Sequence, residues 1–289
     1  MSGSARHGSS RGRPALPSRI ERRNAQFQQW ESLLRSRTMR TRSGEMILQG
    51  VRPITQAVAH GMELRALLTD GRERHSRWAA ELLAAAPAPV VELAPELMAE
   101  LGEREDGPPE LLAVVVVPQD DPARLGPVLD AAGASPVIVA FDRPSSPGNI
   151  GSLARTADAL GASALVTTGH SADVWDPGAI RASTGSLMAL PVLRLAAPRD
   201  LLAVVDARRA SGEEWTVVGL DEAGGRTLDQ VDLTGPTVLV VGNETTGMSA
   251  PWREACDEVA EIPMGGSASS LNASVAGSIA LYERRRQLG

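Results

Sequence analysis

Short apolar runs, each followed by a polar loop, recur along this chain of 289 residues and limit the folds that it can adopt. Leu112–Val117 and Val137–Phe141 are entirely apolar, and Ala164–Thr168 and Thr237–Val241 are nearly so. Runs of this length and composition are typical of strands that are buried on both faces of a parallel sheet. Segments with helical periodicity separate them, so the sequence predicts an α/β fold in which helices cover the sheets.

A connection rich in Pro, Ala, Gly and Asp divides this pattern into two domains. We expect a small α/β domain over residues 21–120, a linker over 121–136 in which Leu125–Ala131 has the composition of a helical turn, and a second α/β domain over 137–289. The elements expected in the first domain are helices at Asn24–Leu34, Val51–His60, Ser76–Ala85 and Pro95–Leu101, strands at Glu45–Gln49, Leu64–Thr69, Val90–Leu93 and Leu112–Val117, and a basic loop at Arg35–Arg42. Those expected in the second are strands at Val137–Phe141, Ala164–Thr168, Val192–Leu195, Thr216–Leu220, Thr237–Val241 and Glu258–Pro263, and helices at Asn149–Leu160, Pro177–Thr184, Pro198–Ala210, from Ser249 and at the C-terminus.

The last helix and the loop before it consist mainly of small residues. The loop is Gly265–Ser269, and its last serine or the next one, Ser270, is placed to cap the helix. The larger residues of the helix fall on one face, at Leu271, Val275 and Tyr282. The small residues between them let another backbone or a flat ligand approach closely, although an ordinary glycine-rich turn before a terminal helix would have the same composition.

Positive charge is concentrated near the N-terminus. Residues 1–52 contain 11 arginines against 3 acidic residues, whereas the whole chain has a net charge of -6. A basic arm on an acidic protein favours a polyanionic partner, most often nucleic acid. Residues 1–20 are rich in Ser, Gly, Arg and Pro and are expected to be a disordered basic tail. A solubilising tail without a binding role is the alternative.

Several other kinds of site and location are disfavoured by the sequence. Cys256 is the only cysteine, which excludes an internal disulfide and fits a reducing cytoplasm. The four histidines are scattered, so no metal site is expected. No apolar run reaches membrane-spanning length, and no apolar segment follows the arginine-rich N-terminus. We therefore expect a cytoplasmic protein without a membrane span or a secretory signal.

Three loops follow predicted strands, at the edge where open α/β sheets bind their ligands. They are Pro147–Arg155, Gly242–Gly247 and Ile262–Asn272. None has the Gly-x-Gly-x-x-Gly pattern of dinucleotide-binding loops, the lysine of a P-loop or the Gly-x-Ser-x-Gly turn of many acyl-transfer enzymes. Each loop alone is a weak signal.

Together and in this order, the three loops resemble the motifs of the SpoU/TrmH class of SPOUT RNA ribose 2′-O-methyltransferases. The matching segments are Asn149-x-Gly-x-x-x-Arg155-x-Ala157 with Gly161, then Val240-Val-Gly-Asn-Glu-x-x-Gly247, then Ile262-Pro-Met with Ser270-Leu-Asn-x-Ser274 and Leu281-Tyr-Glu283. The resemblance covers residues 137–287, and the N-terminal domain resembles the L30e-like substrate-binding domain that precedes this catalytic domain. Within the class, Asn24–Trp30 and Asp142–Gly151 are most similar to 23S rRNA uridine methyltransferases that confer antibiotic resistance.

The resemblance implies a parallel sheet with a deep trefoil knot, a homodimer, and S-adenosylmethionine as methyl donor. Carried over position by position, the cofactor contacts would be Gly242, Asn243, Ile262, Met264 and Leu271. The catalytic positions would be Asn149, Arg155 and Ser270 at the reacting ribose, with Glu244 and Asn272 ordering the knot loops. The basic segments add expected RNA contacts at Arg37, Arg40, Arg42, Arg52 and Arg181.

The implied reaction is an in-line displacement at a sulfonium methyl group, in which a ribose 2′-hydroxyl attacks the methyl carbon. The protein therefore has to position the attacking oxygen and ease the loss of its proton. An arginine side chain stays protonated near neutral pH and is a poor general base. We therefore expect Arg155 to bind the adjacent phosphate or the developing alkoxide, with Ser270 or water relaying the proton. The expected substrate is 23S rRNA, at a uridine. The alternatives are tRNA, or an RNA-binding protein that kept the fold without catalysis.

Overall fold

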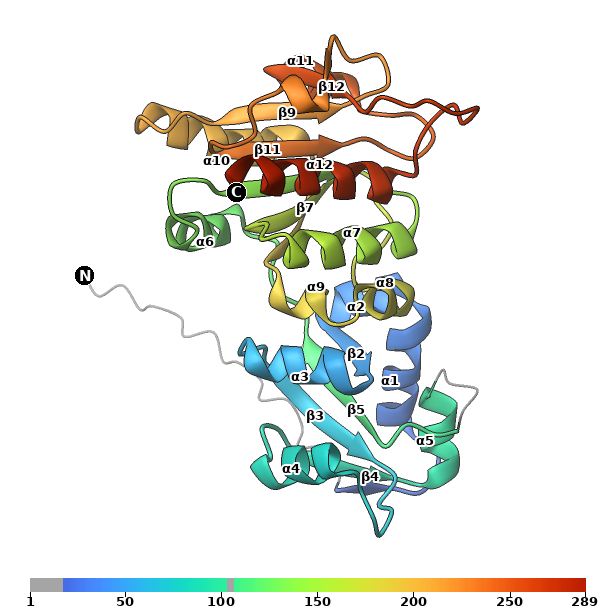
Figure 1. The fold of residues 1–289 in the computed structure, drawn as a ribbon. Coiled ribbons are helices and arrows are strands. Elements are labelled where there is room, and N and C mark those ends of the chain that lie inside the picture. The colour runs from blue at the N-terminus through green and yellow to red at the C-terminus, as the bar shows by residue number, and fades with distance from the viewer. Residues whose placement is uncertain (1–17, 103–106) are drawn as a thin grey trace, which may run out of the picture.

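The protein consists of two α/β domains stacked end to end, as its computed structural model shows (Figure 1). The structure describes residues 18–102 and 107–289, so most of the tail predicted for residues 1–20 lies outside the described residues. Arg19–Ile20 form strand β1, which pairs in parallel with β4 (Val90–Leu93). The prediction of disorder is therefore wrong for residues 19 and 20, because the edge of a sheet satisfies their backbone groups.

In the part of the chain that the structure describes, the N-terminal domain contains a five-stranded mixed sheet with the order β1-β4-β3-β5-β2. Strand β5 (Leu111–Val116) runs antiparallel to both β3 (Leu64–Thr69) and β2 (Glu45–Gln49), whereas β3 and β4 are parallel. The helices of this domain are α1 (Ala25–Arg35), α2 (Arg37–Ser43), α3 (Val51–Ala59), α4 (Arg77–Ala85) and α5 (Pro95–Leu101). The alternation of helices and strands predicted from the sequence is confirmed.

The segment Arg35–Arg42 is helical over most of its length, so the predicted basic loop is wrong. Ser36 caps α2 by accepting a hydrogen bond from the Met39 N–H (3.3 Å), and Gly44 ends the helix in a left-handed conformation with φ of 65°. Both residues are common helix boundaries. The helix buries one of its arginines, Arg40, which a solvated loop would have left exposed.

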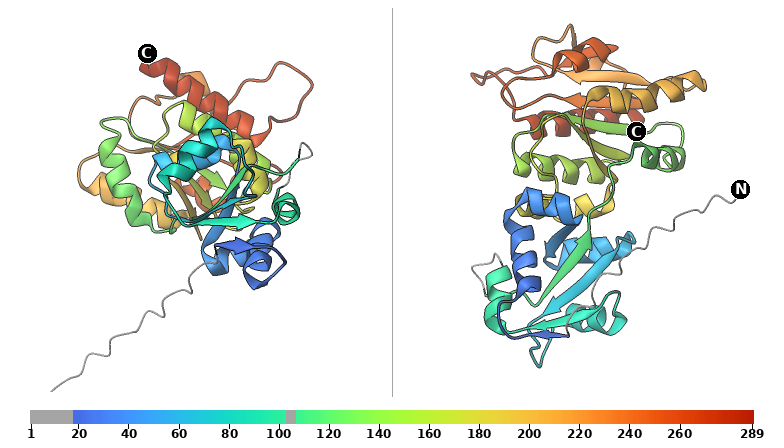
Figure 2. Two further views of the ribbon diagram at one scale, coloured as in Figure 1. Left: turned by 90° about the horizontal axis from the view of Figure 1, so that it is seen from below. Right: turned by 180° about the vertical axis from the view of Figure 1, so that it is seen from behind.

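The C-terminal domain is built on a seven-stranded sheet with the order β10-β12-β9-β11-β6-β7-β8, in which all neighbours are parallel. Its strands are β6 (Val137–Asp142), β7 (Ala164–Thr168), β8 (Val192–Leu195), β9 (Thr216–Leu220), β10 (Arg226–Thr227), β11 (Thr237–Val241) and β12 (Glu258–Glu261). Its helices are α7 (Pro147–Ala159), α8 (Pro177–Ser183), α9 (Ser186–Ala189), α10 (Pro198–Ala210), α11 (Ala250–Ala255) and α12 (Ala273–Leu288). Helices α7 and α12 cover one face of the sheet, and α10 and α11 cover the other (Figure 2). None of the described helices is long and apolar enough to cross a membrane.

The segment predicted as a linker, residues 121–136, is packed against the C-terminal domain. Pro122–Arg124 form a short 3-10 helix, η1, and Leu125–Ala131 form α6, which confirms the helical turn expected there. Leu125 and Leu129 are buried in the same cluster as Ile138 of β6 and Leu193 of β8. The connection therefore belongs to the second domain rather than forming a free spacer.

Helix α12 packs with its small residues inward. A Cβ added to Gly277 would lie 2.8 Å from Leu153 of α7 and 3.0 Å from Val241 of β11, so a larger residue would push these side chains away. Val275 and Tyr282, two of the larger residues predicted to share one face, are 46% and 64% exposed. The helix also begins later than predicted, because Asn272 caps it in place of a serine.

The two domains share a hydrophobic core. Ile54 and Ala57 of α3 belong to the same buried cluster as Leu187 and Met188 of α9. The domains meet where α9 lies between α7 and α3 (Figure 1). This continuous core fixes one domain against the other.

Candidate active site

A cavity of about 370 Å³ lies at the carboxyl ends of β9, β11 and β12, the edge where the sequence predicted a ligand. Its lining includes all five residues expected to contact a cofactor, namely Gly242, Asn243, Ile262, Met264 and Leu271. Glu244 and Ser270 line it as well. A cavity of this size, lined by both apolar and polar groups, has the properties of a small-molecule site.

The loop after β11, residues 242–248, turns back on itself at the wall of this cavity. Asn243 and Gly247 exchange two backbone hydrogen bonds of 3.0 Å. The Asn243 side chain accepts a hydrogen bond from the Thr245 N–H (2.9 Å) and donates one to the Arg143 carbonyl oxygen (2.6 Å). A Cβ on Gly242 would lie 2.6 Å from the backbone of Gly247. The loop therefore requires glycine at position 242 in order to close.

One chain of hydrogen bonds joins the three motif loops. The side-chain amide nitrogen of Asn149 donates a hydrogen bond to the Glu244 carboxylate (2.8 Å). The side-chain amide oxygen of Asn149 accepts one from the Asn272 side chain (3.0 Å). Asn272 caps α12 by accepting a hydrogen bond from the Ser274 N–H (2.9 Å). Glu244 also accepts from the backbone N–H (2.9 Å) and the hydroxyl (2.8 Å) of Ser145. Residues separated by about a hundred positions are thus held in one arrangement.

The Glu244 side chain is suited to accept hydrogen bonds rather than to take a proton. Partial burial acts to raise the pKa of its carboxyl group, but hydrogen bonds from Asn149 and Ser145 outweigh burial and hold the pKa below its ordinary value. Hydrogen bonds donated to a carboxylate favour its charged form. Glu244 is therefore ionised at neutral pH and acts as a fixed acceptor.

The residues expected at the reacting ribose do not share one cavity within a single chain. Ser270 lines the cavity after β11, but Arg155 and Asn149 do not. Asn149 reaches the cavity loop through Glu244. Arg155 lies further along α7, is exposed, and lines a separate hollow of about 240 Å³ at the domain junction.

The prediction that Arg40 contacts RNA is wrong. Its side chain is 3% exposed and donates hydrogen bonds to Asp173 (2.7 Å) and to the Leu33 carbonyl oxygen (2.6 Å). Asp173 belongs to the C-terminal domain, so Arg40 forms a buried ion pair between the domains. The sequence did not reveal this pair, because its members are 133 positions apart.

The other four arginines expected to bind RNA lie at the surface: Arg37, Arg42, Arg52 and Arg181. Arg37 donates one hydrogen bond across the domain junction, to the Ser171 carbonyl oxygen (2.6 Å). Arg42 and Arg52 form no ion pair with any residue that the structure describes. Their guanidinium groups are therefore accessible to a phosphate.

The loop after β9 was not predicted from the sequence. Asp221 and Glu222 line the cavity, and Arg253 of α11 forms an ion pair with Asp221 (2.5 Å) beside them. A carboxylate at this position can accept hydrogen bonds from the hydroxyl groups of a ligand. The signal was present, because Asp221 is the first polar residue after the apolar strand Thr216–Leu220.

Two residues that brace the cavity loop were also missed. Asp142 is buried at the end of β6 and accepts hydrogen bonds from the Ser249 N–H (2.7 Å) and the Thr168 hydroxyl (3.1 Å). Arg143 follows in a left-handed conformation with φ of 50° and donates to the Gly247 carbonyl oxygen (2.9 Å). They tie both ends of the loop after β11 to the centre of the sheet.

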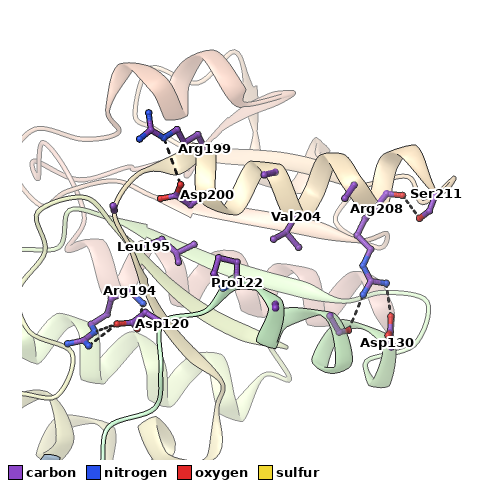
Figure 3. A pocket seen from close by; sticks show the side chains of 15 residues that line it. Asp120, Pro122, Asp130, Arg194, Leu195, Arg199, Asp200, Val204, Arg208 and Ser211 are labelled. Carbon is purple, nitrogen blue, oxygen red and sulfur yellow. Dashed lines mark hydrogen bonds and ion pairs between the residues drawn. The ribbon is translucent and has the colours of Figure 1, made fainter. Parts of the chain in front are cut away.

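A larger groove of about 1290 Å³ lies between η1–α6 and α10 (Figure 3). Its arginines are paired with neighbouring carboxylates, as Arg194 with Asp120 (2.8 Å), Arg208 with Asp130 (2.7 Å) and Arg199 with Asp200 (3.8 Å). None of the motif residues lines this groove. We therefore place the candidate active site at the smaller cavity.

Comparison with known proteins identified two matching family models. The SpoU L30e-like domain matches residues 24–113, and the SpoU rRNA Methylase family matches residues 136–282. A 23S rRNA (uridine(2479)-2′-O)-methyltransferase from Streptomyces viridochromogenes is 51% identical over 269 residues, which are 93% of this chain and 92% of the relative. The 23S rRNA (guanosine-2′-O-)-methyltransferase RlmB from Pseudomonas syringae pv. tomato is 36% identical over 165 residues, which are 57% of this chain and 64% of the relative.

Solved structures resemble both domains together. The SpoU methyltransferase AviRb from Streptomyces viridochromogenes, in complex with the cofactor AdoMet, superimposes with a TM-score of 0.86 at 50% identity and covers 92% of this chain and 98% of its own. An AdoMet-bound rRNA methyltransferase from Sinorhizobium meliloti superimposes with a TM-score of 0.77 at 26% identity and covers 94% of this chain and 100% of its own.

Proposed function

This chain belongs to the SpoU rRNA methylase family, and we propose that it transfers a methyl group from S-adenosylmethionine to a ribose 2′-oxygen of a 23S rRNA uridine. One observation supports the proposal most strongly. Three loops that are distant in sequence and match the family motifs meet at one cavity, where Glu244, Asn149 and Asn272 connect them. The relative described as a 23S rRNA uridine 2′-O-methyltransferase supports a 23S rRNA uridine as the substrate, because the two chains are similar over nearly their whole lengths.

The cavity after β11 fits S-adenosylmethionine, which supplies an activated methyl group when bound. Ile262 and Leu271 offer apolar surfaces for the adenine ring, and the backbone around Gly242 offers hydrogen-bonding groups. We assign Asp221 as an acceptor for ribose hydroxyls. The two solved relatives that contain this cofactor support S-adenosylmethionine as the methyl donor.

For the reaction itself, we assign Arg155 to the RNA and Ser270 to proton transfer. An arginine cannot serve as the base at neutral pH, but its charge stabilises a phosphate or a developing alkoxide. The Ser270 hydroxyl, at the edge of the cavity, can pass the proton of the 2′-hydroxyl to water. Glu244 and Asn272 act through the loops that they hold.

We also propose a homodimer in which a second copy completes the site. Val275 and Tyr282 are exposed and lie seven residues apart, so both occupy one face of α12. Arg155, on the neighbouring helix α7, lines no part of its own chain's cavity. A second copy packed on α7 and α12 would cover the apolar residues and bring Arg155 of one protomer towards the cavity of the other.

Three further proposals follow from family membership. They are the trefoil knot through which α12 would pass, a cytoplasmic location at the site of ribosome assembly, and resistance to avilamycin of cells whose ribosomes carry the modification. Expression in a sensitive host tests the last of these. The minimal inhibitory concentration should rise with the wild type and stay unchanged with Arg155→Ala.

The substrate proposal is tested with radiolabelled S-adenosylmethionine and purified 23S rRNA, 16S rRNA and bulk tRNA in parallel. We expect label in 23S rRNA alone, and its loss in Arg155→Ala with cofactor binding retained. Label only in tRNA would preserve the chemistry and overturn the substrate. No label in free RNA or in assembled ribosomal subunits, despite measured cofactor binding, would indicate an RNA-binding protein without catalysis.

A further inference from the structure

A hollow of about 240 Å³ lies at the junction of the two domains, apart from the cavity after β11. One side is formed by α3 of the N-terminal domain, and the other by α7 and the turn between α8 and α9. The polar side chains that line it are those of Arg52, Gln56, Arg155, Asp158, Thr184 and Ser186. Charged groups of both domains thus share one concave surface.

The packing of the junction fixes the shape of this hollow. Thr184 and Gly185 have φ angles of 49° and 103°, so the chain turns sharply between α8 and α9. A Cβ on Gly185 would lie 3.2 Å from the Arg52 carbonyl oxygen, which shows how closely the turn approaches α3. Ile54 on the buried side of α3 packs into the core that the two domains share. The two sides of the hollow are therefore held at a set distance.

The two arginines of the hollow have no partner within residues 18–102 and 107–289. Neither Arg52 nor Arg155 forms an ion pair or a side-chain hydrogen bond there. In the large groove of Figure 3, by contrast, Arg194 and Arg208 are paired with carboxylates. Asp158 also lines the hollow, but it pairs with neither arginine. The hollow carries a net positive charge that the described residues do not neutralise.

We propose that this hollow binds a backbone phosphate of the substrate RNA, held by Arg52 from one domain and Arg155 from the other. This proposal rests on the proposed function and identifies where the RNA strand is bound. Guanidinium groups bind phosphate oxygens through paired N–H donors, and the Gln56 amide can add a neutral donor. A concave site with two unpaired cations attracts polyanions. Its volume of about 240 Å³ admits a single phosphodiester group.

This arrangement gives the N-terminal domain a direct part in placing the reacting nucleotide. Arg155 belongs to the catalytic domain and Arg52 to the substrate-binding domain. A phosphate bound by both would therefore fix the position of the RNA on the N-terminal domain relative to the catalytic residues of the C-terminal domain. Because both side chains hold the same group, the loss of either should reduce what the other contributes.

Binding of a fluorescent single-stranded fragment of 23S rRNA, measured at several salt concentrations, tests the proposal. Arg52→Ala should weaken binding roughly tenfold, as the loss of a hydrogen bond between charged groups does. It should also lower the slope of log affinity against log salt by about one. The matched control is Arg77→Ala, because Arg77 lies on α4 with its side chain 92% exposed and paired with Glu81. The control removes the same charge from the same domain and should leave both quantities nearly unchanged.

Two further variants separate a shared phosphate from two independent contacts. Arg52→Ala with Arg155→Ala should weaken binding by less than the product of the single effects. Asp158→Asn should tighten binding, because it removes the carboxylate from the hollow. Equal binding by Arg52→Ala and Arg77→Ala would overturn the site even if the wild type methylates RNA, and so would strictly additive effects of the two arginines. A binding defect in Arg52→Ala without any methyl transfer by the wild type would instead refute the proposed function and leave the phosphate site standing.

Discussion

Replacing Arg40 with methionine would remove the charge from the buried ion pair between the domains while keeping much of the side chain's apolar length. The Asp173 carboxylate would remain in an interior where its own side chain is 5% exposed. Removing one member of a buried pair costs about 3–5 kcal/mol. Asp173 would keep the Trp175 N–H at 3.1 Å and Arg194 at 3.7 Å, so we expect the lower end, about 3 kcal/mol.

Thermal unfolding followed by circular dichroism measures this loss. For a protein of this size about 1 kcal/mol corresponds to roughly 2–4 °C, so Arg40→Met should lower the midpoint by about 6–12 °C. Arg77→Met is the control, because a change at an exposed arginine stays within about 0.5 kcal/mol. Adding Asp173→Asn to Arg40→Met should restore part of the stability, since the unpaired charge is then removed.

If Arg40→Met and Arg77→Met unfolded within about 1 kcal/mol of each other, the buried ion pair would not have the stabilising effect that we assign to it. That result would mean that water or Arg194 compensates Asp173. Asp173→Asn can restore stability only if Arg40→Met has first lowered the unfolding midpoint. The double variant is therefore compared with Arg40→Met alone.

Three further predictions concern the cavity and the proposed dimer. Gly242→Ala should weaken S-adenosylmethionine binding at least tenfold in calorimetry with little loss of global stability, because the new Cβ would lie 2.6 Å from the Gly247 backbone; unchanged affinity would show that the loop adapts. Because the pKa of Glu244 is lowered, its charged form stabilises the loops fully at pH values above 4.5, the ordinary pKa of a glutamate. This stabilisation is lost as the pH falls through the lowered pKa of Glu244. Cofactor affinity should therefore decrease below about pH 4.5, and Glu244→Gln should be weak at every pH; identical pH profiles would contradict this role. Tyr282→Glu should convert a dimer to a monomer in sedimentation velocity, and a dimer that survives would place the interface elsewhere.

Much of the fold was predictable because its strands are continuous apolar runs. Val137–Phe141 and Thr237–Val241 are buried on both faces, so composition alone indicated parallel strands. Two-residue strands such as β1 carry no periodicity, and their existence depends on the edge that they join. The basic composition of Arg35–Arg42 obscured the capping residues Ser36 and Gly44, which were present in the sequence.

The candidate site was predictable where the motif residues themselves line it. Gly242, Ile262 and Leu271 all lie at the cavity, since they occupy loops at the carboxyl ends of strands. The separation of Arg155 from this cavity depends on how α7 packs, which no spacing along the chain reveals. Arg40 was wrongly expected to bind RNA, because the sequence does not show whether an arginine is buried against a carboxylate or exposed to solvent.

We expect the transferred methyl group on a ribose 2′-oxygen. Its position can be measured by labelling 23S rRNA with the wild type, digesting the RNA with alkali and separating the products. A methylated 2′-oxygen cannot assist strand cleavage, so we expect all label to be recovered in one alkali-resistant dinucleotide whose 5′ residue is uridine. Label recovered in mononucleotides would place the methyl group on a base and would contradict ribose methylation.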